Sequence, residues 1–335
     1  MLPLHEIDRL AVTVDEEWRS PAADAVAAAW GGEPGAARWW RSSASHVFVL
    51  PDPGGSGRSY LRFTPVAHAS RQRVGAVADL VGRLHRDGVR VAAPVPSTTG
   101  TLVETVPTPL GRMHATCVRA APGEQLDVGE LTPAQARAWG ASLASLHAAA
   151  AELDSTLAAR LPTAGSVLEE ARAALADDAP AAGAVRLVQE ALERLPAGPA
   201  AVGIVHGDYE LDNLCWEGGA ATSYDFDEAR VSWYAADLAH AARDLTSRGA
   251  PLPEHRERYD ALLTGYLDVR PYAVEHLAHL PLHSRASAAV SLARLRGVLA
   301  DDVPLQHEPL VRLRPELQRL ADEHRAHLLD APAAV

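Results

Sequence analysis

The stretch "HGDYELDN", residues 206–213, follows directly on the apolar run "AVGIV", residues 201–205. The run is typical of a buried strand, whereas the stretch after it carries three acids, a histidine and an asparagine. Charged groups that lack partners are costly beside a hydrophobic core. A loop of this composition therefore indicates a ligand site, in which a bound group supplies the missing positive charge.

A β-hairpin follows this loop and extends the site. "NLCW" at 213–216 and "TSYDF" at 222–226 flank Glu217-Gly218-Gly219, a good hairpin signal. The hairpin brings Asp208 and Asn213 at its start near Asp225 at its end. An Asp, an Asn five residues later and an Asp after a hairpin form the arrangement that phosphoryl transfer uses. The first carboxylate orients and deprotonates a hydroxyl, and the other two oxygen ligands suit Mg²⁺.

Composition limits the classes of protein that this chain can belong to. Its 335 residues are 47% hydrophobic, enough for two cores. The net charge of -12, with arginine as the only cationic residue apart from histidine, argues against nucleic acid as a partner. No run reaches the roughly 18 apolar residues of a membrane span, and no signal peptide is evident, so we expect a cytoplasmic protein without a membrane partner. Cys117 and Cys215 are interpreted as core residues.

The first part of the chain predicts a small antiparallel sheet with helices. Ser20-Pro21 begins a helix that ends before Gly31-Gly32. Strand-forming segments at 46–50 and 59–63 flank "PDPGGSGR" at 51–58, which is interpreted as a turn because it fits neither of the glycine-rich phosphate motifs. A helix over 74–89 and strands over 99–105 and 114–120 follow.

Beyond residue 127 the pattern is helical almost throughout. Thr132 and Gln135 form a capping box, and the helix after them has one apolar face. The hairpin at 213–226 is the one strand pair expected in this part. The chain is therefore predicted to be an α+β protein, with a sheet first and helices after it.

Five segments resemble the aminoglycoside phosphotransferase and choline kinase group of the protein-kinase-like superfamily. They are "SYLRF", "CVRAAPGEQLD", "LTPAQARAWGASLASLHA", "IVHGDYELDNLCW" and "SYDFDEARVSWYAADLAHAARDL", spread over residues 40–245. The resemblance implies a bilobal fold, with a nucleotide-binding lobe over 1–117 and a catalytic and acceptor-binding lobe over 118–335. It also implies ATP and Mg²⁺ as cofactors and a small hydroxylated molecule as the partner.

The resemblance assigns roles to the residues of the loop and hairpin. Asp208 resembles the catalytic base, and Asn213 and Asp225 resemble the Mg²⁺ ligands. Asp227 is expected to assist from behind them. His206 is expected to hold backbone in place rather than to act as a base.

The residues around this loop are candidates for the acceptor side. Asp237 resembles a residue that braces the catalytic loop. Tyr209 and Glu210 lie inside that loop, near any bound hydroxyl. Trp233 and Tyr234 either border the acceptor pocket or belong to the core.

On the nucleotide side the family has a lysine on its third strand, and Arg62 occupies that place here. The alternative is an arginine on the solvent face of a strand. Arginine differs from lysine in reach and geometry. In the family a glutamate on the next helix pairs with this basic residue. Val77 stands at the glutamate's place here, and Asp79 lies two residues away on another helix face.

Two further segments are implied to touch the nucleotide. Ser43 and Ser45, in "SSAS" at 42–45, occupy the loop that covers the phosphates in the family. Backbone groups near Arg119 and Ala121 are expected to bind the adenine.

Together these features predict an ATP-dependent O-phosphotransferase that acts on a small molecule. An antibiotic is the first choice of acceptor, as in resistance kinases, and a metabolite such as homoserine, choline or a sugar is the second. A nucleotide-binding sensor without activity is the alternative from another class. Arg62 and Val77 favour the sensor, whereas the intact trio of Asp208, Asn213 and Asp225 opposes it.

Overall fold

The computed structural model describes residues 1–51, 57–300 and 303–330, so most of the predicted turn at 51–58 lies outside the described residues. The chain forms two compact units. The first comprises residues 1–83, 92–120 and 294–320, and the second comprises 84–91, 121–293 and 321–335.

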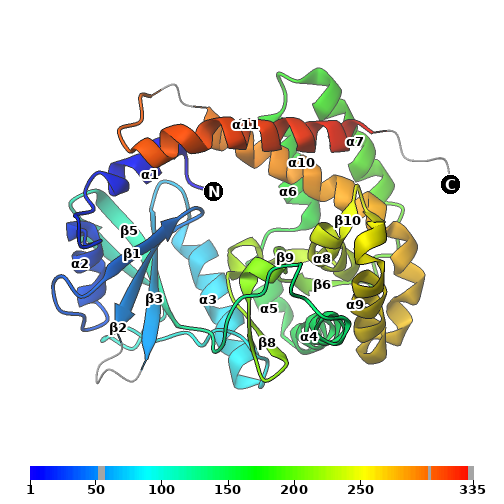
Figure 1. Ribbon diagram of the computed structural model, residues 1–335, viewed down its shortest axis with the longest axis horizontal. Coiled ribbons are helices and arrows are strands. Elements are labelled where there is room, and N and C mark those ends of the chain that lie inside the picture. Colours follow the sequence, from blue (N-terminus) through cyan, green and yellow to red (C-terminus); the bar gives the residue numbers. More distant parts are fainter. Residues whose placement is uncertain (52–56, 301–302, 331–335) are drawn as a thin grey trace. The chain divides into compact units, whose positions relative to one another are not determined.

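The first unit contains a five-stranded antiparallel sheet (Figure 1). Its strand order is β1-β2-β3-β5-β4, and the predicted segments at 46–50 and 59–63 are confirmed as β2 and β3. The strands are β1 (Arg38–Ser42), β2 (His46–Pro51), β3 (Arg58–Pro65), β4 (Glu104–Thr108) and β5 (Gly111–Arg119).

The predicted strand over 99–105 is confirmed only at Glu104 and Thr105, because β4 begins at Glu104. Thr99 and Thr101 donate their hydroxyls to the Glu104 carboxylate at 2.6 and 2.8 Å. Gly100 has φ +83°, which an extended strand does not have. Hydroxyl-to-carboxylate bonds of this local kind compete with strand pairing and favour a turn.

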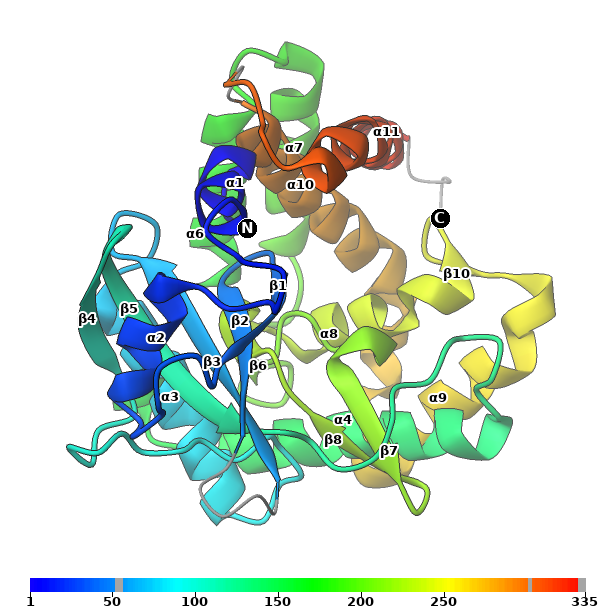
Figure 2. The same ribbon diagram turned by 60° about the vertical axis from the view of Figure 1, so that its left-hand side comes forward.

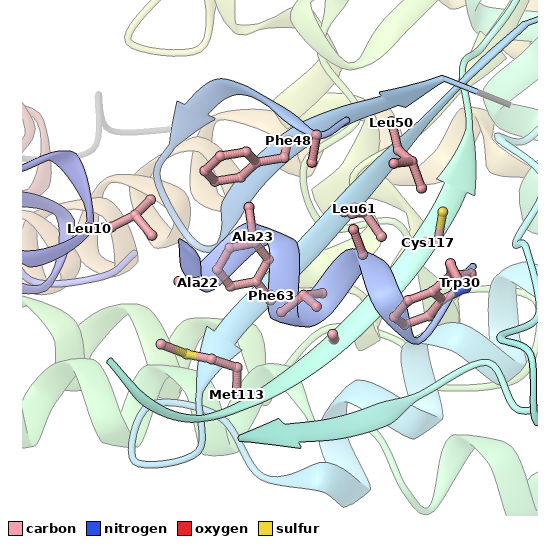
Figure 3. Close-up of a cluster of buried hydrophobic side chains, with 14 residues drawn as sticks. Leu10, Ala22, Ala23, Trp30, Phe48, Leu50, Leu61, Phe63, Met113 and Cys117 are labelled. Atoms are coloured by element: carbon pink, nitrogen blue, oxygen red, sulfur yellow. The ribbon is translucent and has the colours of Figure 1, made fainter. Parts of the chain in front are cut away.

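Helix α2 (Pro21–Ala28) covers one face of the sheet (Figure 2). Ser20 caps it as predicted, accepting a hydrogen bond from Ala22 N–H at 3.3 Å. Alanines let the helix approach the sheet closely, and the strands supply most of the large side chains, with Trp30 and Leu10 added from outside them (Figure 3). The rings of Phe48 and Phe63 stack there with centroids 5.5 Å apart. Two further helices are α1 (Leu4–Ala11) and α3 (Arg71–Arg86).

The second unit is mainly helical. The predicted capping box at the start of α4 is confirmed, with Thr132 and Gln135 exchanging hydrogen bonds of 3.2 and 3.0 Å. Helices α4 and α9 lie side by side in backbone contact: a Cβ at Gly140 would meet Leu262 O at 1.9 Å, and a Cβ at Gly265 would meet Arg137 O at 1.9 Å. The helices that lie wholly or partly in this unit are α4 (Pro133–Ala151), α5 (Ser155–Ala158), α6 (Ala164–Ala174), α7 (Ala179–Leu192), α8 (Tyr234–Ala241), α9 (Arg256–Val269), α10 (Leu280–Leu299) and α11 (Glu308–Leu329).

The predicted hairpin is confirmed as β7 (Leu214–Glu217) paired with β8 (Ala220–Ser223). The expectation of a single strand pair in this part is wrong. β6 (Val202–Val205) pairs with β9 (Arg230–Trp233), and β10 (Thr246–Ser247) pairs with β11 (Ala250–Pro251). Strands of two to four residues are too short for an alternating pattern to reveal. The short 3-10 turns are η1 (Leu211–Asn213), η2 (Phe226–Glu228), η3 (Ala242–Leu245), η4 (Pro253–His255) and η5 (Pro271–His279).

Among the described helices, none combines the length and the apolar character that crossing a membrane requires. Cys117 is buried in the core of the first unit, as predicted, whereas Cys215 is only half-buried. Neither forms a disulfide with another described residue.

Candidate active site

The loop at 206–213 runs from β6 to β7, and Asp237 on α8 holds its start. One Asp237 oxygen accepts the N–H of His206 at 2.7 Å and the other accepts the N–H of Gly207 at 2.7 Å. His147 Nε2 lies 3.1 Å from the same carboxylate. Burial alone would raise the pKa of Asp237, but the hydrogen bond with His147 holds it below its usual range. Asp237 is therefore an ionised, fully buried brace, as its place in the sequence predicted.

Gly207 and His206 both have contacts that depend on the conformation of this loop. Gly207 has φ +86°, and a Cβ there would lie 2.1 Å from Glu228 O. His206 is fully buried, and its Nε2 lies 3.0 Å from Tyr224 O while its Nδ1 accepts Asp208 N–H at 3.3 Å. Burial lowers the pKa of His206, which agrees with a neutral ring in this tautomer. The predicted structural task of His206 is thus borne out by its contacts.

A third contact fixes the loop to α4. Tyr209 is 1% exposed and donates its hydroxyl to Ser142 Oγ at 2.9 Å. Burial raises the pKa of Tyr209, so the phenol stays protonated. The side chain is part of the core, and it does not face an acceptor as the sequence had suggested.

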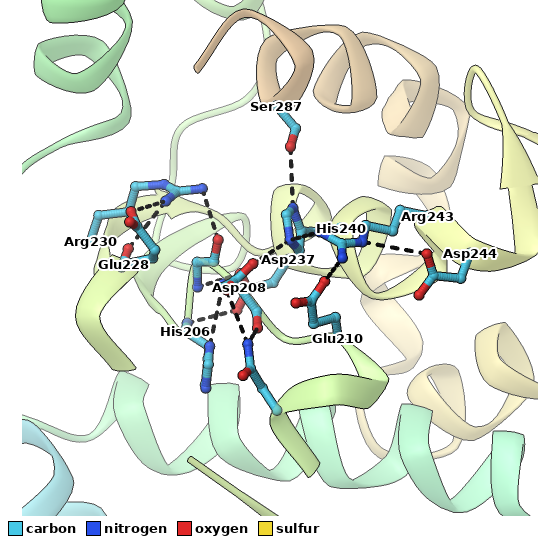
Figure 4. Close-up of polar contacts among 12 residues, drawn as sticks. His206, Asp208, Glu210, Glu228, Arg230, Asp237, His240, Arg243, Asp244 and Ser287 are labelled. Atoms are coloured by element: carbon cyan, nitrogen blue, oxygen red, sulfur yellow. Dashed lines mark hydrogen bonds and ion pairs between the residues drawn. The ribbon is translucent and has the colours of Figure 1, made fainter. Parts of the chain in front are cut away.

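The Asp208 carboxylate is held from two sides (Figure 4). Asn213 Nδ2 donates to one oxygen at 3.0 Å and to the Asp208 backbone oxygen at 2.9 Å. His240 Nε2 lies 2.6 Å from the other oxygen. Burial acts to raise the pKa of Asp208, but the hydrogen bond and the charge of His240 hold it far below its usual range. Asp208 is therefore a fixed, ionised carboxylate at neutral pH.

Asn213 and Asp225 are the predicted metal ligands. Because the Asn213 amide nitrogen donates to Asp208, its amide oxygen is the atom suited to a cation. The backbone of Tyr224 connects the two, since its N–H donates to Asn213 O at 3.1 Å. Asp225 adopts a left-handed conformation, with φ 65° and ψ 62°, which costs about 1 kcal/mol or more and is typical of functional sites. An amide oxygen and a carboxylate are hard ligands and fit Mg²⁺. Asp227 lies two residues further on, in η2.

Two basic side chains around Asp208 were not predicted. His240 lies three residues after Asp237 on α8, a spacing that places both on one side of a helix and that could have identified it. Arg243 forms an ion pair with Glu210. Burial and the neighbouring Asp208 raise the pKa of Glu210 to about 8. Ligand atoms of Asp208, Glu210 and His240 lie within 4.8 Å of one another, but Arg243 already supplies a positive charge there, so we assign them no metal.

A pocket borders this site within the second unit. It is small, with about 30 Å³ of space for water-sized molecules, and α6, α7, β9, α8 and α10 form its walls. Trp233 lines the pocket, and its acceptor-side role stays a prediction. Tyr234 is 4% exposed and packs under the Arg270 guanidinium, which lies 4.1 Å from its ring centroid. Tyr234 is therefore a core residue.

The predicted phosphate-side residues lie in the first unit. Arg62 is in the middle of β3, opposite Val47 and Thr116 of the neighbouring strands. Ser43 and Ser45 form the turn between β1 and β2, where Ser43 N–H donates to Ser45 O at 3.0 Å. These placements are compatible with the assignments, which stay predictions.

The predicted adenine segment is already partly hydrogen-bonded. Arg119 N–H donates to Ala93 O at 2.8 Å, so this group is not a donor for a purine. Ala121 opens the second segment of the other unit. On α3, Asp79 forms an ion pair with Arg83, with Nε 3.1 Å from Oδ1.

Comparison with known proteins places this geometry among phosphotransferases. Residues 41–272 match the model of the "phosphotransferase enzyme family". The amicoumacin kinase of Bacillus subtilis (strain 168) is 28% identical over 161 residues, which is 45% of this chain and 46% of that protein. The chain therefore matches less than half the length of that relative.

Two solved structures have a similar fold. An amicoumacin kinase in complex with AMP-PNP and Ca²⁺ has a TM-score of 0.74 at 18% identity, with 91% of each chain covered. A microcompartment-associated aminopropanol kinase has a TM-score of 0.66 at 20% identity, with 91% of this chain and 94% of that chain covered. These likenesses confirm the predicted α+β, kinase-like fold.

Proposed function

The chain belongs to the phosphotransferase enzyme family, and from this we propose that it transfers the γ-phosphate of ATP to a hydroxyl of a small molecule. The observation that carries the proposal is the Asp208 carboxylate. It is ionised and fixed by Asn213 and His240, as a base that accepts a hydroxyl proton must be.

Each residue of the site has one task in this proposal. Asp208 orients the acceptor hydroxyl and takes its proton, which contributes on the order of 10²- to 10⁴-fold to the rate. The oxygens of Asn213 and Asp225 hold Mg²⁺. Magnesium, when bound, neutralises charge on the phosphate oxygens. Asp237 and Tyr209 keep the loop in the conformation that presents Asp208.

The acceptor is proposed at the level of a class. An antibiotic is our first choice, supported by the likeness to amicoumacin kinases in sequence and in fold. A small amino alcohol or a related metabolite is the second, supported by the likeness to an aminopropanol kinase. A nucleotide-binding sensor is disfavoured because Asp208, Asn213 and Asp225 are all present.

Radiolabel transfer from [γ-³²P]ATP in the presence of Mg²⁺, against a panel of antibiotics and amino alcohols, tests the proposal. We expect Asp208→Asn to lower kcat by about 100-fold or more, because the amide cannot accept the proton. Nucleotide affinity, measured by calorimetry, should change less than about threefold. The matched control is Asp212→Asn, the same substitution at an exposed position of the same loop, which should leave kcat unchanged. Nucleotide binding without transfer to any compound would instead favour the sensor.

A further inference from the structure

The residues that precede the two predicted metal ligands are joined by a hydrogen bond. Asp212 precedes Asn213, and Tyr224 precedes Asp225. The Tyr224 hydroxyl donates to the backbone oxygen of Asp212 at 2.5 Å, whereas the Asp212 side chain is exposed and is not needed for this contact. A single side chain therefore ties the segment that carries one ligand to the segment that carries the other.

Gln125 joins this contact from a third segment of the chain. Its side-chain amide donates to Asp212 O at 2.6 Å and to the Tyr224 hydroxyl oxygen at 2.7 Å. Both amide N–H groups and the phenol O–H thus have acceptors within the cluster. The backbone of Glu124, the residue before it, exchanges hydrogen bonds of 2.8 and 3.2 Å with that of Trp216 on β7. Gln125 therefore reaches the cluster from a fixed place.

The backbone of Tyr224 is held as well as its side chain. Its N–H donates to Asn213 O at 3.1 Å, and its carbonyl oxygen accepts from His206 Nε2 at 3.0 Å. The next residue, Asp225, has φ 65° and ψ 62°, a strained conformation that persists only where the surrounding structure imposes it. Tyr224, bound at its N–H, its carbonyl and its hydroxyl, supplies that constraint.

We propose that Tyr224 and Gln125 are positioning residues for the metal site, which set the separation of Asn213 and Asp225 and keep Asp225 in its strained conformation. This inference rests on the proposed function and deepens it. Ligands that are already held in place lose little conformational freedom when a cation binds, so they bind it more tightly. Residues that orient metal ligands in this way commonly change metal affinity by roughly 10- to 100-fold.

Binding of AMP-PNP to the full chain, measured by calorimetry with saturating Mg²⁺ and again with EDTA, tests this without any phosphate transfer. The ratio of the two dissociation constants reports how much the metal tightens nucleotide binding. We expect Tyr224→Phe, which removes only the hydroxyl, to lower this ratio by about threefold to tenfold, the effect of one lost hydrogen bond. The dissociation constant in EDTA should stay within about twofold of the wild-type value, because no metal is bound there. A variant with a loosened fold would instead bind more weakly in both conditions.

Two further variants sharpen the test. Gln125→Ala, at an exposed position, should also lower the ratio, and it decides the question if Tyr224→Phe does not fold. The double variant should lower the ratio by less than the product of the two single effects, because both side chains bind the same Asp212 oxygen. The matched control is Tyr259→Phe, the same substitution on α9, which should leave the ratio unchanged.

A ratio that Tyr224→Phe leaves unchanged, equal weakening with Mg²⁺ and with EDTA, or no tightening by Mg²⁺ in the wild-type chain would overturn the inference. Its failure is distinct from that of the proposed function. A chain whose Mg²⁺-dependent binding falls in Tyr224→Phe but that transfers phosphate to nothing contradicts only the proposed function. A chain that transfers phosphate, while Tyr224→Phe binds AMP-PNP with Mg²⁺ as the wild type does, contradicts only the positioning role.

Discussion

Removal of the Asp237 carboxylate is expected to release the catalytic loop. Asp237 accepts three hydrogen bonds, from His206 N–H, Gly207 N–H and the His147 ring, all in a fully buried place. Each donor left without a partner costs about 1–3 kcal/mol, so Asp237→Ala should lower the free energy of unfolding by about 3–9 kcal/mol. That is a large part of the 5–15 kcal/mol typical of a folded protein.

Asp237→Asn should lower the free energy of unfolding by less than Asp237→Ala does. In Asp237→Asn the amide oxygen replaces one carboxylate oxygen, while its NH₂ group faces a donor, so one hydrogen bond is lost and the loss is about 1–3 kcal/mol. The control is Asp260→Asn, an exposed carboxylate paired with Arg256 at 2.9 Å, whose pair contributes about 0–1 kcal/mol.

Urea unfolding followed by circular dichroism measures the free energies, and hydrogen exchange of the peptide that contains residues 203–211 measures loosening of the loop. We expect faster exchange in both Asp237 variants and a kcat that is lower by about 10- to 100-fold. Because the pKa of Asp237 is held below its usual value, its stabilisation is present above the unfolded-state pKa of about 3.9 and is lost as the pH falls below it. Unchanged exchange at 203–211, or equal losses in Asp237→Asn and Asp260→Asn, would refute the bracing role.

Three further predictions follow from the second unit. Gly123→Ala should lower the free energy of unfolding in urea by about 3 kcal/mol or more, because its Cβ would lie 1.9 Å from a backbone oxygen at φ +87°. The control Gly218→Ala, with φ +58° and open space around it, should lower this free energy by only about 1 kcal/mol. Equal losses would contradict the close approach at Gly123. His283→Phe should flatten the pH dependence of stability. The pKa of the wild-type histidine is about 3 in the folded chain and 6.5 in the unfolded chain, so the wild-type protein loses about 1.4 kcal/mol of stability per pH unit as the pH falls below 6.5. Parallel stability curves for the two proteins would be evidence against a neutral buried ring. His240→Phe removes the 2.6 Å contact to Asp208 and should lower kcat by about tenfold or more with nucleotide affinity unchanged by calorimetry; an unaltered kcat would show that the carboxylate does not need this contact.

Local signals in the sequence predicted much of the fold. The Ser20 cap, the capping box at Thr132 and the glycines of the β7–β8 hairpin act on neighbouring residues, and the structure forms each of them as expected. The strand prediction failed at the start of 99–105. Thr99 and Thr101 are good strand formers by type, but here their hydroxyl groups bind the Glu104 carboxylate.

The candidate site was predictable only where residues lie on one motif. Asp208 and Asn213 are five residues apart and belong to one motif. Asp237 holds His206 from 31 residues away, and only the family resemblance indicated that Asp237 braces the loop. The contact of His240 with Asp208 depends on how α8 packs, and the pocket draws its walls from five separate elements. Such tertiary contacts have no periodic pattern in the chain, so they became visible only in the structure.

Helix α4, which approaches α9 closely at Gly140 and Gly265, also supports the catalytic loop, and this has a consequence for engineering. Ser142 and His147 of α4 hold the catalytic loop, directly or through Asp237, and none of these three residues lines the pocket. Random mutagenesis restricted to α6 and α10 should therefore leave these supports of the loop intact. The same mutation load on α4 should mostly produce inactive clones.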